Sequence, residues 1–81
     1  MKATYDKEAD AMYIRVKKGR VKKTLELSDS LLVDIDARGT VLGIEMLDVS
    51  SKIPTRRISQ TFAKKGIPVS LAPRTVLTRI D

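Results

Sequence analysis

Residues 31–46 read LLVDIDARGTVLGIEM, and this stretch decides the fold. Apolar residues alternate with other residues on both sides of its centre, which is typical of strands that bury one face. Arg38 and Gly39 are suited to the two-residue turn that joins hairpin strands. The resulting register pairs three apolar residues with three others on one face: Leu31 with Met46, Val33 with Ile44, and Ile35 with Leu42. Because a slip of one residue would separate all three pairs, the register is well specified.

A second hairpin is predicted upstream, over residues 11–27. Residues 11–16 and 21–27 both alternate, and Gly19 between them is expected to supply the positive φ of a tight turn. The expected cross-strand pairs are Met12 with Leu25, Ile14 with Lys23, and Val16 with Val21. A short strand around residues 3–5 is expected to precede this hairpin.

The pattern changes after the hairpins. Ile58 and Phe62 lie four residues apart, and residues 64–68 (KKGIP) place cations, then glycine, then proline, as at a helix end. We predict a helix over residues 55–65 that lays Ile58 and Phe62 on the sheet. Residues 67–81, with two prolines, are expected to form an edge strand, an arm that reaches a neighbour, or a tail without fixed structure.

The predicted fold class is α+β, a small antiparallel β-meander of four to five strands with one short C-terminal helix packed on one face. We expect one domain over residues 1–81, with a β-hairpin core at 2–49, a helical segment at 50–66 and a basic arm or edge strand at 67–81. A chain of 81 residues hides only about 60–65% of its unfolded surface. A homodimer is therefore expected, because a second copy covers apolar surface that one copy cannot.

The composition excludes several kinds of chemistry. The chain has no cysteine and no histidine, which removes disulfides, thiolate catalysis, the usual zinc sites and imidazole acid–base catalysis. A small domain without disulfides is typical of the cytoplasm. The N-terminus carries no apolar stretch that resembles a signal peptide, and no apolar run approaches the length of a membrane span. We expect a cytoplasmic protein that is not an enzyme and has no cofactor and no membrane segment.

Asp6, Glu8 and Asp10 form a D-x-E-x-D array that resembles the start of an EF-hand loop. The loop's central glycine and terminal glutamate are missing, since Ala11 and Lys17 occupy those positions. We therefore interpret Asp6 and Asp10 as turn residues whose side chains accept bonds from loop N–H groups, and predict no metal site.

A second acidic group invites an acid–base interpretation, which requires two carboxylates beside a substrate cleft. Its members are Asp34, Asp36, Glu45 and Asp48. A domain of this size has little room for such a cleft, so we interpret them as solvated carboxylates on the outer face of the sheet. Ser50 and Ser51, followed by Lys52, invite a nucleophile interpretation, but serines before a helix more often cap it. We predict no catalytic residues.

The net charge of +6 lies in the C-terminal part of the sequence. Residues 1–51 carry nine Lys/Arg and nine Asp/Glu, whereas residues 52–81 carry seven Lys/Arg against Asp81. The candidate contact residues are Lys52, Arg56, Arg57, Lys64, Lys65, Arg74 and Arg79. Three interpretations remain open for them: a solvated basic tail, a surface for an acidic protein partner, or a nucleic-acid contact. Phe62 is the only aromatic residue of this region, so it offers few bases a stacking surface.

Two stretches of the sequence resemble a known family. The first is residues 4–16, TYDKEADAMYIRV, and the second combines LVDID at 32–36, Gly39 and VLGIEMLD at 41–48. Both are similar, in order and spacing, to the motifs of the domain of unknown function 2283, a family of small prokaryotic proteins. The resemblance covers about residues 2–49.

The resemblance implies a compact antiparallel sheet with a C-terminal helix and no established activity. Some members lie beside small toxin-like genes, which implies an antitoxin-like binding role. The sequence thus predicts a small non-enzymatic binding or interaction protein, the antitoxin-like partner of a small toxin. The alternative is a nucleic-acid-binding protein that uses the basic last thirty residues.

Overall fold

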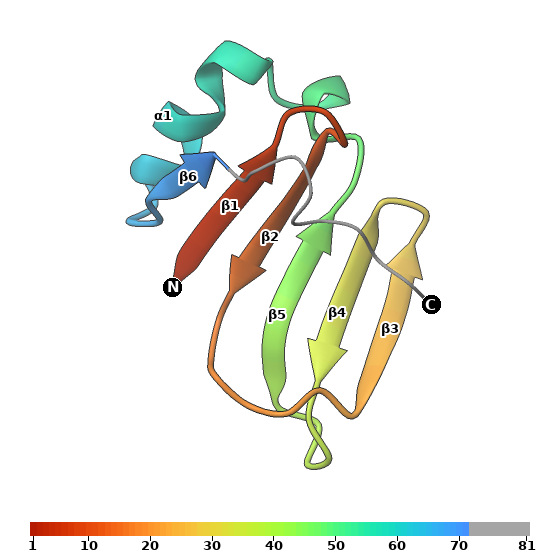
Figure 1. The fold of residues 1–81 in the computed structure, drawn as a ribbon. Coiled ribbons are helices and arrows are strands. Elements are labelled where there is room, and N and C mark those ends of the chain that lie inside the picture. The colour runs from red at the N-terminus through yellow and green to blue at the C-terminus, as the bar shows by residue number, and fades with distance from the viewer. Residues whose placement is uncertain (72–81) are drawn as a thin grey trace.

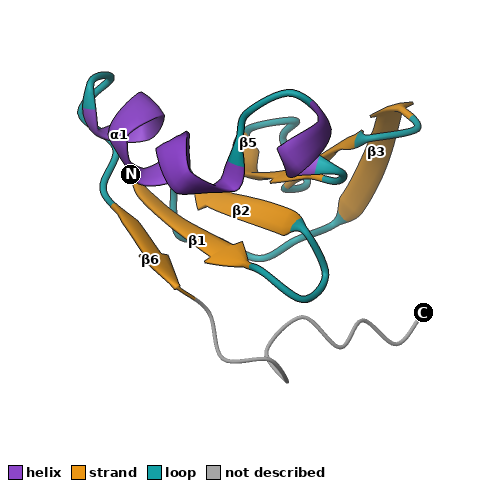
Figure 2. Cartoon of the chain, turned by 90° about the horizontal axis from the view of Figure 1, so that it is seen from above, coloured by secondary structure: helices purple, strands orange, loops and turns teal. Residues whose placement is uncertain are grey.

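The computed structural model describes residues 1–71, which form a sheet covered on one face by short helices (Figures 1 and 2). The strands are β1 (Lys2–Asp6), β2 (Ala11–Arg15), β3 (Lys23–Ser28), β4 (Leu31–Ile35), β5 (Val41–Met46) and β6 (Val69–Leu71). Two 3-10 turns, η1 (Val49–Ser51) and η2 (Thr55–Arg57), lead into the helix α1 (Ile58–Ala63). The strand order across the sheet is β3-β4-β5-β2-β1-β6.

The predicted α+β class is confirmed, but the sheet is mixed rather than antiparallel. After α1 the chain turns at Gly66, which has a φ of 78°, and β6 then runs parallel to β1. The N–H of Ala3 donates to the carbonyl of Pro68 and begins this pairing. Residues 69–71 are therefore an edge strand, and the remainder of the predicted arm, residues 72–81, lies outside the described residues.

The hairpin that decided the fold is present, with one difference in register. Leu31 lies opposite Met46 and Val33 opposite Ile44, as predicted, but Ile35 lies opposite Val41 instead of Leu42. A bulge at this end of the strand pair accounts for the shift. The loop spans residues 36–40, with Gly39 at a φ of 85°.

The predicted hairpin between residues 11–16 and 21–27 is wrong. β2 pairs with β1 and β5, and β3 pairs with β4 at the far edge, so Leu25 lies opposite Val33 rather than Met12. Met12 is fully buried in the centre of the sheet, whereas every residue of β3 is exposed. Burial of Met12 between two strands outweighs a local hairpin that would leave it near an edge. Gly19 does not adopt a positive φ, because the connection is a crossing segment rather than a tight turn.

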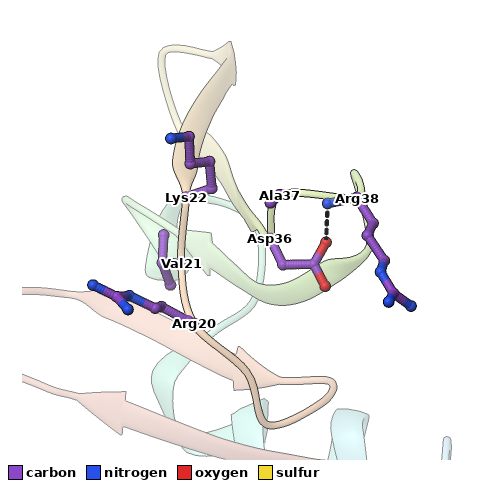
Figure 3. A pocket seen from close by; sticks show the side chains of 6 residues that line it. All are labelled: Arg20, Val21, Lys22, Asp36, Ala37 and Arg38. Carbon is purple, nitrogen blue, oxygen red and sulfur yellow. Dashed lines mark hydrogen bonds between the residues drawn. The ribbon is translucent and has the colours of Figure 1, made fainter.

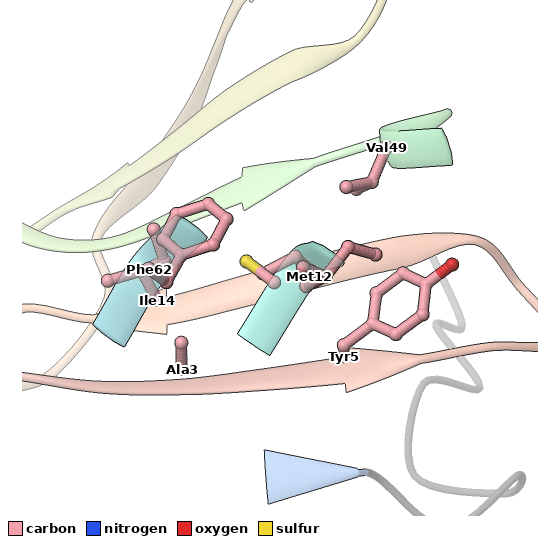
Figure 4. Close-up of a cluster of buried hydrophobic side chains, with 7 residues drawn as sticks. Ala3, Tyr5, Met12, Ile14, Val49 and Phe62 are labelled. Atoms are coloured by element: carbon pink, nitrogen blue, oxygen red, sulfur yellow. The ribbon is translucent and has the colours of Figure 1, made fainter. Parts of the chain in front are cut away.

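The core lies between the helical layer and the half of the sheet that contains β1, β2 and β5 (Figure 4). Its buried side chains are Ala3, Tyr5, Met12, Ile14, Val49, Ile58 and Phe62. The prediction that Ile58 and Phe62 lie on the sheet is confirmed. The predicted serine cap is wrong, since Ser50 and Ser51 belong to η1 and Arg57 precedes α1.

Candidate nucleic-acid interface

One end of the sheet gathers most of the cations of the first fifty-one residues. β1, β3 and β5 begin at this end, and β2 and β4 finish there (Figure 1). Eight of the nine Lys/Arg of residues 1–51 lie on these strand ends and their connections. We call them the basic rim: Lys2, Arg15, Lys17, Lys18, Arg20, Lys22, Lys23 and Arg38. All eight are exposed.

The strand connections at the opposite end of the sheet are mostly acidic. Its connections carry Glu8, Asp10, Asp29 and Asp48, together with Lys7, the one cation of residues 1–51 that is not in the basic rim. The equal numbers of cations and carboxylates in this segment therefore conceal a separation of charge along the strand direction. Within residues 1–51 this separation makes the basic rim the more positive of the two ends.

Two open depressions lie in the basic rim. One is lined by Arg20, Val21, Lys22, Asp36, Ala37 and Arg38, and the other by Met1, Lys2, Arg15, Val16, Lys17 and Lys18. Figure 3 shows Arg20, Lys22 and Arg38 extending outward from the loop backbone of the first depression. Outward cations around an open depression are accessible to the phosphates of a polyanion.

Asp36 is the carboxylate among the residues that line these depressions. Its Oδ1 accepts bonds from the N–H groups of Arg38 and Thr40, each at 2.9 Å. The Thr40 bond is the main cause of the lowered pKa of Asp36, and the Arg38 bond and the charge of Lys17 lower it further. Asp36 thus stays ionised and orders the loop that carries Arg38, while it offsets one of the eight positive charges.

The crossing segment between β2 and β3 is anchored to the sheet. Val16 and Lys17 donate their N–H groups to the carbonyl of Leu42, at 2.9 and 3.1 Å. A Cβ on Gly19 would lie 2.7 Å from a methyl of Leu42, so glycine permits the close approach of this segment. The four cations of residues 17–22 therefore project from a backbone with fixed attachments.

The contact residues predicted from the C-terminal charge lie elsewhere. Lys52, Arg56, Arg57, Lys64 and Lys65 are all exposed on the helical layer. Lys52 follows η1, which bonds to Asp10 at the end of the sheet opposite the basic rim, whereas Lys64 and Lys65 precede the turn that brings Pro68 beside Ala3, near the start of β1. Arg56 and Arg57 precede α1, and Lys64 and Lys65 follow it. Arg74 and Arg79 lie outside the described residues.

The D-x-E-x-D array behaves as turn residues, which confirms that interpretation. Asp6 Oδ1 accepts bonds from the N–H groups of Glu8 and Ala9 at 2.9 and 3.1 Å. Asp10, with a φ of 52°, accepts a 2.7 Å bond from the Tyr5 hydroxyl and bonds from the N–H and hydroxyl of Ser50. Within residues 1–71 no group of three or more acidic side chains is placed to hold a metal ion.

The protonation states of this cluster follow from the same bonds. Burial works to raise the pKa of Asp10, but the bonds from Ser50 and Tyr5 outweigh it and the pKa lies below its ordinary value. Burial, and then the bond to Asp10, raise the pKa of Tyr5. The carboxylate is therefore held ionised and the phenol neutral, as a structural pair requires.

Asp34 lies on the outer face of the sheet, as the sequence predicts, but it is half-buried and accepts bonds from two neighbouring strands. On the face away from the helices, the ring of Tyr13 crosses Gly43 and its hydroxyl donates to Asp34 at 3.0 Å. Thr24 donates its hydroxyl to the other oxygen of Asp34 at 2.6 Å. Glu45, unlike Asp34, is buried, with 8% of its surface exposed, so the prediction of a solvated carboxylate is wrong for this residue. These groups connect β2, β4 and β3 across the sheet.

Among residues 1–71 no helix is both long and apolar enough to cross a membrane. A curated relative, the uncharacterized protein MJ0789 of Methanocaldococcus jannaschii, is 42% identical over 50 residues, which is 62% of this chain. The matched stretch spans 42% of that relative, so the chain corresponds to less than half of its length. No solved structure matches the chain.

A family model described as protein of unknown function (DUF2283) matches residues 2–50, from the start of β1 into η1. This match covers more than half of the chain and includes β1 to β5, the Tyr13–Asp34 bond and the whole basic rim. The chain therefore belongs to the DUF2283 family.

Proposed function

We propose that the protein is a non-enzymatic module that binds a nucleic-acid backbone through the basic rim. The observation that carries the proposal is the collection of eight exposed cations, with one carboxylate among them, at a single end of the sheet. An exposed cluster of cations is sufficient to neutralise phosphates and release their counterions, which is the main source of non-specific binding. A cytoplasmic location is part of the same proposal.

The dimensions of the basic rim suit a duplex. The five strands from β1 to β3 span about 19 Å at the usual strand spacing of about 4.8 Å. A duplex carries one charge per about 1.7 Å of axis, so several phosphates fall within this width. If four rim cations contact phosphates, the logarithm of the binding constant falls with the logarithm of salt with a slope of about −3.6.

The positions of the aromatic residues favour backbone contacts over base stacking. The chain has three aromatic side chains: Tyr5 and Phe62 are in the core, and Tyr13 lies across Gly43. None is available at the rim as a stacking platform for single-stranded bases. We therefore expect little sequence preference and no advantage for single strands.

We also propose, as part of the same function, that the protein does not catalyse a reaction. The shifted pKa values of Tyr5, Asp10 and Asp36 all move away from neutrality, which keeps the phenol neutral and the carboxylates ionised. A general acid or base needs a pKa near the working pH.

The test measures fluorescence anisotropy of a labelled random duplex against salt. The rim variant carries Lys17→Gln, Lys18→Gln and Arg20→Gln, all at exposed positions between strands. The matched control removes three charges from the helical layer with Lys52→Gln, Arg56→Gln and Arg57→Gln, and a third variant carries Arg74→Gln and Arg79→Gln. Truncation after Ser51 is unsuitable, because it removes Ile58 and Phe62 from the core.

We expect the rim variant to bind at least tenfold more weakly at about 50 mM salt, with a slope shallower by about 1–3, and the two C-terminal variants to change little. Equal binding by the rim variant and the wild-type chain would overturn the proposal. Loss of binding only in the C-terminal variants would transfer the function to those cations.

The second candidate is the antitoxin-like role that the family resemblance implies. The observation in its favour is that the same basic rim is complementary to an acidic protein. The two candidates separate in a capture experiment from the native host after nuclease treatment. A stoichiometric acidic protein that survives the treatment and is lost in the rim variant supports this candidate over the first.

A further inference from the structure

Among residues 1–71, the outer edge of β3 is the longer of the two open edges of the sheet. β3 is the terminal strand, and its six residues are all exposed (Figure 1). The other edge, β6, has three residues in the described part of the chain. An exposed edge strand presents unpaired N–H and C=O groups that can pair with another strand.

The side chains of β3 add apolar surface to this edge. Leu25 is 37% exposed and Leu27 is 60% exposed, although neither is near a chain end. The helical layer covers β1, β2 and β5, and no residue of β3 belongs to the core cluster. Within residues 1–71 the outer edge of β3 thus has no partner strand, in a chain small enough to gain from one.

The order of charges along β3 indicates which partner fits. Lys22 and Lys23 lie at its start, and Glu26 and Asp29 lie at its end. A parallel copy would place like charges together. An antiparallel copy brings the basic start of each strand beside the acidic end of the other, and opposite-charge pairs across strands are stabilising.

We propose that two copies of this chain associate through antiparallel pairing of their β3 strands, about a two-fold axis at Leu25. Leu25 then lies opposite the second copy's Leu25, and Thr24 lies opposite the second copy's Glu26. Lys22 is diagonal to Glu26 across the interface, and Lys23 is diagonal to Asp29. Centring the pair on Glu26 would instead oppose two like charges.

The interface is isologous, so it closes at two copies and joins two sheets into one. The bulge between Glu26 and Ser28 shortens the strand available for pairing. We therefore expect a weak dimer that forms at tens of micromolar or above, as small interfaces do. This inference goes beyond the proposed function, and its experiment does not alter Lys17, Lys18 or Arg20, which carry the binding test.

The experiment is sedimentation equilibrium of the full chain up to about 500 µM, a range chosen because interfaces below ~1,200 Å² are weak. The wild-type chain should approach twice the monomer mass. Leu25→Lys places two like charges face to face and should return the monomer at every concentration, with an unchanged far-UV spectrum. The matched control, Leu71→Lys, changes an apolar residue of the other edge strand that is 75% exposed, and should leave the dimer intact.

Exchange of the charges at the two ends of β3 provides an independent test of the dimer. One variant carries Lys22→Glu and Lys23→Glu, and the other carries Glu26→Lys and Asp29→Lys, so each has an edge of a single sign. Each should be monomeric alone, and their mixture should form a heterodimer. A wild-type chain that stays monomeric throughout, a dimer that survives Leu25→Lys, or a mixture that fails to associate would each overturn the proposal.

Discussion

The substitution Gly43→Ala, which adds one methyl group, tests how the two halves of the sheet are joined. The ring of Tyr13 in β2 crosses Gly43 in β5 to reach Asp34 in β4. A Cβ at residue 43 would overlap the hydroxyl and ring of Tyr13. The φ of Gly43 is not positive, so alanine fits the backbone there and the overlap is the only obstacle. Gly43→Ala therefore displaces Tyr13.

Two opposing effects set the magnitude. Displacement of the ring breaks its hydrogen bond to the Asp34 carboxylate, which contributes about 1.5–3 kcal/mol. Replacement of glycine by alanine inside a strand returns about 0.5–1 kcal/mol. The net effect on the free energy of unfolding is a loss of about 0.5–2.5 kcal/mol. For a domain of this size that lowers Tm by about 4–8 °C per kcal/mol.

The sign of the effect should depend on Tyr13. In a Tyr13→Ala background the obstacle is absent, and Gly43→Ala should raise stability by about 0.5–1 kcal/mol. Urea unfolding followed by far-UV circular dichroism measures all four members of this double-mutant cycle. If Gly43→Ala has the same effect with and without the tyrosine ring, the contact does not carry the coupling that we assign to it.

Three further predictions concern stability. Asp10→Asn should lower the free energy of unfolding in urea by about 1–2 kcal/mol, because asparagine tolerates the φ of 52° but removes the charged acceptor of the Ser50 and Tyr5 bonds. The control Asp48→Asn, at a φ of 51°, should cost under ~0.5 kcal/mol, and equal costs for the two variants would refute the role of these bonds. The pKa of Asp10 is lower in the folded than in the unfolded chain, so the stabilisation by Asp10 is present above pH 3.8, its ordinary pKa, and is lost as pH falls through the folded pKa. The free energies of unfolding of the wild-type and Asp10→Asn chains should therefore converge as pH is lowered, and parallel curves would contradict this. Ile58 is 2% exposed, so Ile58→Ala should lower the free energy of unfolding by about 2–5 kcal/mol, whereas Leu71→Ala should be nearly neutral. An unfolding midpoint unchanged by Ile58→Ala would mean that α1 does not pack as described.

The sequence predicts where the strands lie better than it predicts which strands pair with each other. Alternation located β2 to β5, and apolar matching predicted most of the β4–β5 register. Alternation does not say which strand pairs with which, so the partner of β3 was predicted from proximity in the chain and was wrong. The bulge near Ile35 depends on loop bonds to Asp36 that no periodicity reveals.

The candidate site was harder to predict for a related reason. A count of charges along the chain points to residues 52–81, because cations and carboxylates cancel in residues 1–51. The fold places eight of the nine cations at one end of the sheet and Glu8, Asp10, Asp29 and Asp48 at the other, and only the strand order makes this visible. A weak signal was present, since six of the eight rim residues lie between Arg15 and Lys23 without an intervening acid.

The central claim concerns location: the cations that bind the polyanion are those of the basic rim. Titration of a short random duplex into the labelled chain, followed by backbone amide NMR shifts, tests it directly. We predict that the largest shifts occur at residues 15–23, with Lys2 and Arg38, and that they fade as salt is raised. Shifts confined to residues 52–65 or 74–79, or no shifts at low salt, would contradict the account.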